Sequence, residues 1–312
     1  MIARRTTGLP RIAAAGLLAL LLAAMPARAV EIPTALGPVS IAAPPRTVAV
    51  FDIAAVDTLL SLGVKPAGLP SKLYVPELEA KGNGTMPVGT IHEPDLEALS
   101  ALAPDLVIIG GRSSPHLDMV RKVAPAIDMT IEGKDMLAEA RRRLFAYGAL
   151  FGRTTEADAI AAKLDAAAAA ARKAVAGKGN ALIVMTNGPK LSAYGAGSRF
   201  GWLHSELGLP PAAPDLGAAI HGEVISFEFI RKTNPDWLIV LDRTVAVGES
   251  GASASATLAN EMVAQTSAGK NGRIVYLPPA DAYIAAGGVS ATLRILARVE
   301  EQFRKEPVQA VP

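Results

Sequence analysis

Short apolar runs rich in β-branched residues alternate along this chain with stretches whose apolar positions recur at helical spacing. The pattern predicts strands at 47–51, 88–90 and 106–109 and helices at 52–63 and 93–103. Asp52 stands where a helix N-cap is expected, and Pro104 ends the second helix. This alternation is typical of a parallel α/β layer rather than a sandwich of sheets.

The middle of the chain changes character. From Asp135 to about Val175 the residues are nearly all helix-forming, with a break near Gly152. The second part, 154–176, makes a helix of about 34 Å at 1.5 Å per residue. β-Rich sequence resumes at 181–185, so this helix separates two α/β units, although taken alone it also fits an ordinary surface helix.

The two halves of the chain look duplicated. Four residues recur at one offset of 131, as the pairs Glu97 and Glu228, Pro104 and Pro235, Asp105 and Asp236, and Arg112 and Arg243. We therefore predict an α/β fold with two Rossmann-like lobes, each with a central parallel-type sheet, joined by a single long α-helix. The expected divisions are an N-terminal lobe at 30–152, a linking helix at 153–177 and a C-terminal lobe at 178–312.

This duplication places charged residues at equivalent points of the two lobes. Ligands bind beyond the carboxyl ends of parallel strands, and Arg112 and Arg243 come just past two such ends. Glu97 and Glu228 fall in the first turns of the preceding helices, which begin at the same edge because each helix runs antiparallel to its strand. Each lobe thus carries a glutamate near its rim and an arginine near the cleft, which predicts a two-lobed clamp.

The first 29 residues have the pattern of an export signal. Arg4 and Arg5 precede an apolar run at 12–24, and Ala27-Arg28-Ala29 fits a small-x-small cleavage site. The run is shorter than the roughly 20 residues that a membrane-spanning helix needs, although an N-terminal anchor is the alternative. We expect cleavage after Ala29 and a freely diffusing periplasmic protein.

Composition narrows the function further. The whole chain of 312 residues has a formal charge of +2, but removing the four arginines of residues 1–29 leaves 27 basic against 29 acidic residues. A nucleic-acid partner then loses its electrostatic basis. The chain contains no cysteine, which excludes thiol catalysis, Cys-based metal sites and attachment of a lipid to a cysteine after the signal.

Catalytic signatures are absent from the sequence. Residues 195–201 approach a dinucleotide-binding fingerprint, but the third glycine comes one residue late, and no P-loop, G-x-S-x-G elbow or H-E-x-x-H motif occurs. The four histidines are scattered, with no pair at i,i+4, which argues against a preassembled metal cage. We expect a binding protein without a resident cofactor; a periplasmic hydrolase or lyase is the alternative from another class.

From about Arg46 to Phe303 the chain resembles the periplasmic iron–siderophore-binding proteins of ABC importers, particularly the catecholate branch. The resemblance rests on an ordered series of short motifs: Phe51-Asp52, Glu93-Pro94-Asp95-Leu96-Glu97, Gly110-Gly111-Arg112, Ser198-Arg199-Phe200-Gly201, His221-Gly222, Ser226-Phe227-Glu228, Leu241-Asp242-Arg243, the run 270–277 and Tyr283. It implies two lobes bridged by one long helix, and capture of a ferric siderophore for delivery to an ABC permease and ATPase in the inner membrane. The clamp arrangement also predicts a monomer.

The resemblance assigns roles to single residues. Arg112, Arg199 and Arg243 would form a positive floor for a ferric tris-catecholate of charge −3, because guanidinium forks match its oxygens. Each arginine, taken singly, also fits a surface ion pair with a neighbouring acid. His221 and Tyr283 would complete the coordination of iron when a siderophore has only two bidentate arms; a capping histidine and a rim tyrosine are the alternatives.

Glu97 and Glu228, one on each lobe, would dock onto basic pockets of the permease dimer, although acids in a first turn also stabilise the helix dipole. Tyr74 and His92 fall in loops expected to face the cleft. The small, Ser/Gly/Ala-rich loop 247–257 departs from the family pattern and borders the cleft. Haem, a corrinoid or a hydroxamate siderophore are the alternative ligands for the same scaffold.

Overall fold

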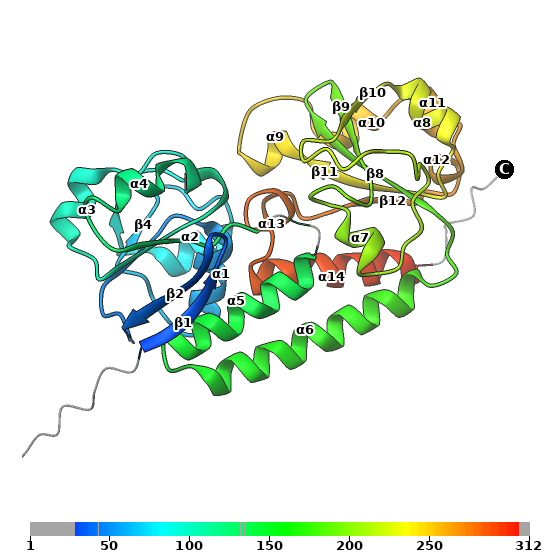
Figure 1. Ribbon diagram of the computed structural model, residues 1–312. Helices are drawn as coiled ribbons and strands as arrows, with labels where there is room; N and C mark the ends of the chain where they lie inside the picture. The colour runs from blue at the N-terminus through cyan, green and yellow to red at the C-terminus, as the bar shows by residue number, and fades with distance from the viewer. Residues whose placement is uncertain (1–28, 43, 132, 134, 306–312) are drawn as a thin grey trace, which may run out of the picture.

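The computed structural model describes residues 29–42, 44–131, 133 and 135–305. The predicted export segment lies outside these residues except for Ala29. Two lobes, each built around its own five-stranded sheet, stand side by side above a layer of long helices (Figure 1). The predicted α/β fold with two lobes is confirmed. No helix among the described residues is both long and apolar enough to cross a membrane.

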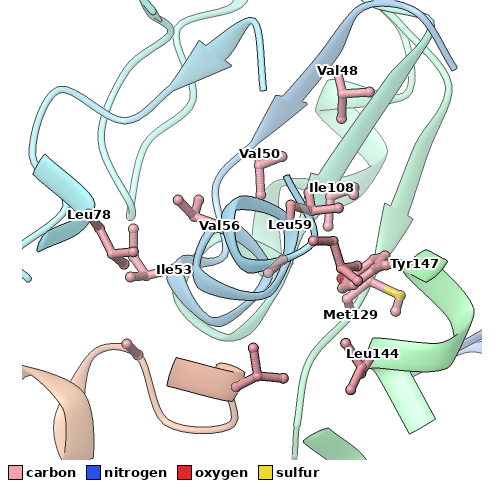
Figure 2. Packing of buried hydrophobic residues seen from close by; sticks show 14 of the residues in the cluster. Val48, Val50, Ile53, Val56, Leu59, Leu78, Ile108, Met129, Leu144 and Tyr147 are labelled. Carbon is pink, nitrogen blue, oxygen red and sulfur yellow. The ribbon is translucent and has the colours of Figure 1, made fainter. Parts of the chain in front are cut away.

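The sheet of the N-terminal lobe is parallel throughout, in the order β5-β4-β3-β6-β7. Its strands are β3 (Val48–Val50), β4 (Gly68–Leu69), β5 (Met86–Pro87), β6 (Leu106–Ile109) and β7 (Ala126–Asp128). Its helices are α1 (Ile53–Ser61), α2 (Pro76–Gly82), α3 (Leu96–Leu102), the 3₁₀ helix η1 (Gly111–His116) and α4 (Leu117–Val120). Helix α1 packs against this sheet through Val56 and Leu59, which face Val50 and Ile108 (Figure 2).

Most predicted elements of this lobe are present, with two differences. The strand expected at 88–90 lies instead at β5, because Gly89 takes a left-handed φ of 115° and bridges to Pro94. The polar lead-in before residue 46 is a hairpin of β1 (Ala29–Thr34) and β2 (Gly37–Ala42), whose Ile32 is fully buried in the core. Its two prolines hide the strand pattern from sequence reasoning, since proline is tolerated only at sheet edges.

The C-terminal lobe has a mixed sheet in the order β10-β9-β8-β11-β12. Its strands are β8 (Ala181–Asn187), β9 (Lys190–Tyr194), β10 (Glu223–Ile225), β11 (Trp237–Asp242) and β12 (Ile274–Tyr276). Its short helices are α7 (Trp202–Ser205), α8 (Phe227–Thr233), α9 (Arg243–Ala246), α10 (Ala254–Leu258), α11 (Glu261–Ala264), α12 (Ser267–Lys270) and α13 (Pro279–Tyr283). Only β8, β11 and β12 are mutually parallel, so the sheet is less purely parallel than predicted.

Two long helices, α6 (Thr154–Val175) and α14 (Val289–Arg304), contribute to the cores of both lobes. The predicted helical middle of the chain consists of α5 (Met136–Leu150) and α6, with the break at Gly152, whose φ is 64°. Helix α14 (Val289–Arg304), which the sequence pattern did not single out, packs against α6 and α1. The first halves of α6 and α14 lie in the core of the N-terminal lobe and their second halves in that of the C-terminal lobe. The lobes are therefore held by a pair of helices.

The internal duplication has a structural counterpart. Helices α3 and α8 are N-capped by the side chains of Asp95 and Ser226, and each ends in a left-handed residue. These two residues, Ala103 with φ 47° and Asn234 with φ 46°, are related by the offset of 131. A non-glycine residue in this conformation is uncommon, so the shared geometry supports a common origin for the two units.

Asp57 fastens α14 to the N-terminal lobe. Its buried carboxylate, on α1, accepts a hydrogen bond of 2.9 Å from the backbone N–H of Ala291 in the first turn of α14. We expect Asp57→Ala to lower the free energy of unfolding by about 2 kcal/mol, because a buried donor is left unpaired. Asp57→Asn, which keeps an acceptor, should lose less in urea denaturation. Equal losses in the two variants would contradict this role.

Candidate functional site

Two guanidinium groups, one from each lobe, converge on Tyr283 at the end of α13. Nη2 of Arg112 donates to the Tyr283 carbonyl oxygen at 2.9 Å, and Nη2 of Arg199 donates to the same oxygen at 3.3 Å. Their central carbons lie 5.0 and 5.1 Å from the centroid of the Tyr283 ring. Together with Arg243, described below, these residues are called the arginine cluster.

Local backbone geometry explains how Arg112 reaches the cluster. Strand β6 is a fully buried apolar run, and Gly110 and Gly111 follow it. A Cβ atom on Gly110 would lie 3.0 Å from the carboxyl carbon of Asp52, and Gly111 takes a φ of 54°. The chain thus turns sharply at the strand end and presents Arg112 at the position that the parallel sheet predicts for ligand contacts.

Arg199 lies in the loop that follows β9. Its guanidinium carbon is 4.7 Å from the ring centroid of Phe200, and that ring packs edge-to-face on Tyr194 at 4.7 Å. Gly133, in the segment between the lobes, passes so close that a Cβ there would lie 2.7 Å from the Arg199 carbonyl oxygen. The rings of Phe200 and Tyr283 therefore contact the guanidinium, while Gly133 packs against the backbone of Arg199.

Positive charge at Arg112 and Arg199 is not neutralised. Among the described residues, no carboxylate forms an ion pair with either guanidinium. Burial, followed by the charge of Arg112, holds the pKa of Arg199 below its ordinary value. Two cations sharing one carbonyl acceptor form a prearranged site for an anion with several oxygens.

Arg243 is the third member of the cluster and is partly neutralised. It is the first residue of α9, and its Nη1 donates to Oδ1 of Asn187 at 3.1 Å and to Oε2 of Glu249 at 2.9 Å. The Glu249 carboxylate, with a smaller contribution from Tyr283, raises the pKa of Arg243. The surface ion pair considered from the sequence is therefore present for Arg243 but not for the other two.

His221 lies in the exposed loop before β10. Among the described residues, its side chain forms no hydrogen bond or ion pair with Tyr283 or with the arginine cluster. Its neighbour Gly222 packs on the ring of Tyr194, where a Cβ would lie 2.8 Å from a ring carbon. Burial raises the pKa of Tyr194 to about 12. The charge of Arg199 opposes this rise and Tyr283 adds to it.

Metal-binding geometry is not assembled in the described residues, where no three histidine, aspartate or glutamate side chains gather closely enough to hold an ion. The expected pair of His221 and Tyr283 thus remains a prediction. Burial, followed by the charge of Arg112, lowers the pKa of His92. Tyr74 is half-buried, with a strained φ of 68°.

Glu97 and Glu228 occupy the predicted positions. Both are exposed and lie in the first turns of α3 and α8, one on each lobe. Sequence reasoning missed Glu249, the partner of Arg243, and Lys72, whose ammonium contacts the opposite lobe. Neither residue lies in a recognisable sequence motif. The unusual composition of the loop 247–257, which contains Glu249, was the one sequence signal that pointed to this region.

Comparisons with known proteins agree with this architecture. A sequence profile of the family described as "Periplasmic binding protein" matches residues 48–280. The petrobactin-binding protein YclQ of Bacillus subtilis is 33% identical over 84% of this chain and 83% of its own length. The ferric-anguibactin-binding protein FatB of Vibrio anguillarum is 31% identical, over 84% of this chain and 83% of its own.

Solved structures lead to the same group. The crystal structure of YclQ matches with a TM-score of 0.83 at 30% identity, covering 89% of this chain and 100% of that one. The periplasmic catecholate-siderophore-binding protein VctP of Vibrio cholerae matches with a TM-score of 0.81 at 30% identity, covering 88% and 100%. The chain belongs to the periplasmic binding protein family, whose members are non-enzymatic transport components that act outside the cytoplasm.

Proposed function

We propose that this protein captures a ferric siderophore of the catecholate type between its lobes, in the periplasm, and delivers it to an ABC permease and its ATPase in the inner membrane. The observation that carries the proposal is the convergence of Arg112 and Arg199, from different lobes, on one carbonyl oxygen without a neutralising carboxylate. The names of its relatives, which bind petrobactin, ferric anguibactin and catecholate siderophores, support this ligand class. The export pattern of residues 1–29 supports the compartment.

The charge and shape of the cluster suit such a ligand. A ferric tris-catecholate is a compact trianion whose oxygens ring the metal. Fixed guanidinium forks bind such oxygens in a defined direction, whereas a flexible ammonium acts as a point charge. Because the cations come from both lobes, the bound anion would also join the lobes electrostatically.

His221 and Tyr283 are proposed as iron ligands for chelates with only two bidentate arms. Tyr283 already lies within the cluster, and His221 precedes Gly222, whose φ of 73° allows the loop to turn against Tyr194. A histidine binds a metal only as the neutral imidazole, through a ring nitrogen lone pair.

Tryptophan fluorescence tests the proposal. Trp202, three residues after Arg199, and Trp237, at the start of the strand that ends before Arg243, are both buried and serve as reporters. The panel comprises hexadentate and tetradentate ferric catecholates, a ferric hydroxamate, ferric citrate, haem and a corrinoid. Tight quenching by the catecholates alone, with a charge-transfer band that His221→Ala or Tyr283→Phe alters for the tetradentate chelate, is the expected result. Binding of only haem, a corrinoid or a hydroxamate would overturn the ligand class.

Glu97 and Glu228 are proposed to dock onto the permease. Reversing both charges, Glu97→Arg with Glu228→Arg, should reduce uptake of the ferric chelate at least tenfold and leave its binding in solution unchanged. The matched control reverses Glu156 and Glu261, which also stand in first turns, of α6 and α11. Uptake at the normal rate in the Glu97/Glu228 variant would contradict the docking role. The two glutamates would then only stabilise their helix N-termini, by about 0.3–1 kcal/mol each.

A further inference from the structure

A lysine of the N-terminal lobe is bonded to the C-terminal lobe beside the arginine cluster. Nζ of Lys72, in the loop between β4 and α2, donates to the backbone carbonyl oxygen of Val247 at 3.3 Å. The same ammonium lies 4.5 Å from the ring centroid of Tyr74. Among the described residues no carboxylate pairs with Lys72, so its charge is directed at this carbonyl and this ring.

The loop that carries Lys72 is held rigidly. Oε1 of Glu79 accepts hydrogen bonds from the backbone N–H groups of Leu73, at 2.6 Å, and Tyr74, at 3.0 Å. Tyr74 adopts a φ of 68°, a left-handed conformation that a non-glycine residue keeps only where its surroundings enforce it. Strain of this kind is concentrated at functional positions. Lys72 is thus presented from a fixed point rather than from a freely moving loop.

On the other side, Val247 is coupled directly to Arg243. Its backbone N–H donates to the Arg243 carbonyl oxygen at 3.1 Å at the end of α9. The Val247 side chain packs against the core of the N-terminal lobe. Both its side chain and its carbonyl oxygen, which accepts from Lys72, therefore contact the opposite lobe. Arg243 therefore belongs to one lobe but is steadied through Val247 by contacts with the other.

Gly248 leaves room for the Lys72 ammonium because it has no side chain. It has a φ of 68°, and a Cβ atom there would lie 2.9 Å from Nζ of Lys72. Any larger residue must displace the lysine from the Val247 carbonyl. Several glycines elsewhere in the C-terminal lobe have similar φ angles without a neighbour; at Gly208, with φ 75°, a Cβ atom would meet nothing within 4 Å. A substitution at Gly208 therefore introduces backbone strain alone, whereas one at Gly248 introduces similar strain and also displaces Lys72.

We propose that Lys72 is a positioning residue for the ligand site: through Val247 it holds α9, and with it Arg243, in the orientation that receives the anion. This inference rests on the proposed function. Lys72 makes no direct contact with the ligand. The rigid turn at Tyr74 and the missing side chain at Gly248 both allow the Lys72 ammonium to reach the Val247 carbonyl oxygen.

The first experiment uses the full ligand-free protein and measures hydrogen exchange in the segment 243–249. Lys72→Met keeps the apolar stem and removes the ammonium, and Gly248→Ala displaces it. Both variants should exchange faster in this segment than the wild type, whereas Gly208→Ala should match the wild type there. Unchanged exchange in Lys72→Met would overturn the proposal, and this result does not depend on which ligand the protein binds.

The second experiment measures the dissociation rate of a hexadentate ferric tris-catecholate by stopped flow. Lys72→Met should raise this rate about three- to tenfold, the net effect of one ordinary hydrogen bond, because Lys72 acts on the ligand only through Arg243; association should change little. In the Arg243→Ala background the same substitution should change the rate less than twofold, because Lys72 acts through Arg243. Full additivity of the two substitutions would overturn the proposal, since it would indicate a direct contact with the ligand.

Failure of the proposed function gives a different result. If the wild-type protein binds no ferric chelate, the ligand class is wrong, and the hydrogen-exchange comparison alone decides whether Lys72 orders α9. If Lys72→Met binds the chelate more tightly than the wild type, the bond to Val247 competes with ligand capture, and the positioning role is rejected.

Discussion

Replacing Arg199 by alanine is expected to lower the affinity for a ferric tris-catecholate about 10- to 100-fold, mainly through faster dissociation. Its guanidinium is desolvated by burial and has no carboxylate partner among the described residues. A hydrogen bond involving a charged group contributes about 1.5–3 kcal/mol, which gives this range of affinities. Arg112→Ala should have an effect of the same order.

The pair should not behave as two independent contacts. Arg112 and Arg199 donate to the same Tyr283 oxygen, so removing one lets the other relax. The double variant should therefore lose less than the sum of the two single losses in free energy. Arg199→Lys, which keeps the charge but not the planar fork, should recover only part of the affinity.

Isothermal titration calorimetry at two salt concentrations checks these values. Arg153→Ala is the matched control, because Arg153 is exposed and pairs with Glu156 at the start of α6. If Arg199→Ala bound the chelate as tightly as the control while remaining folded, the anion site would have to lie elsewhere. Affinity that does not weaken at the higher salt concentration would contradict an electrostatic floor, since exposed charges are screened.

Sequence patterns predicted the framework of the site because its elements are locally determined. Strand β6 is an unbroken apolar run, and Asp52, Asp95 and Ser226 cap helices as their residue types favour. Ligands bind at the carboxyl ends of parallel strands, and the structure places Arg112 and Arg243 just past the ends of β6 and β11, as the sequence pattern predicted; their contact with a ligand stays a prediction.

Long-range pairings lay beyond the same reasoning. The bond between Lys72 and Val247 joins residues 175 apart, and no local pattern specifies it. Strand β10 is three residues long and largely exposed, so it carries no alternating signal. Arg199 follows an antiparallel strand rather than a parallel one, and only the family resemblance suggested its role. The convergence on the Tyr283 carbonyl is a property of the assembled lobes.

Asp52 makes the stability of the protein depend on pH. Its side chain caps α1, with Oδ1 accepting from the Ala54 N–H at 3.3 Å, while its carboxyl is packed against Gly110. Burial raises the pKa of Asp52 to about 6 from the ordinary value of 3.8, even though the nearby charges of Arg143 and Arg112 oppose the shift. The folded protein therefore binds a proton here more readily than the unfolded chain.

The sign of the effect follows from this difference. Between about pH 4 and pH 6 the folded state carries more protons at Asp52 than the unfolded state, so the contribution of this group falls as the pH rises. About 1.4 kcal/mol is lost for each unit between the two pKa values, which gives about 2–3 kcal/mol in total. Asp52→Asn keeps the acceptor for Ala54 without the charge, so it should remove this loss and stabilise the protein at pH 7.

Urea denaturation of both proteins at pH 4.5 and pH 7.5 measures the difference directly. The stability gained by Asp52→Asn over the wild type should be larger at pH 7.5 than at pH 4.5. Asp95→Asn, at the exposed N-cap of α3, serves as the control and should show no such rise with pH. A gain that stays constant with pH would mean that the fold does not raise the pKa of Asp52, and a loss at pH 7.5 would mean that the fold stabilises the charged carboxylate. Its attraction to Arg112 and Arg143 would then outweigh burial, and the positive charge available to an anion at Arg112 would be correspondingly smaller.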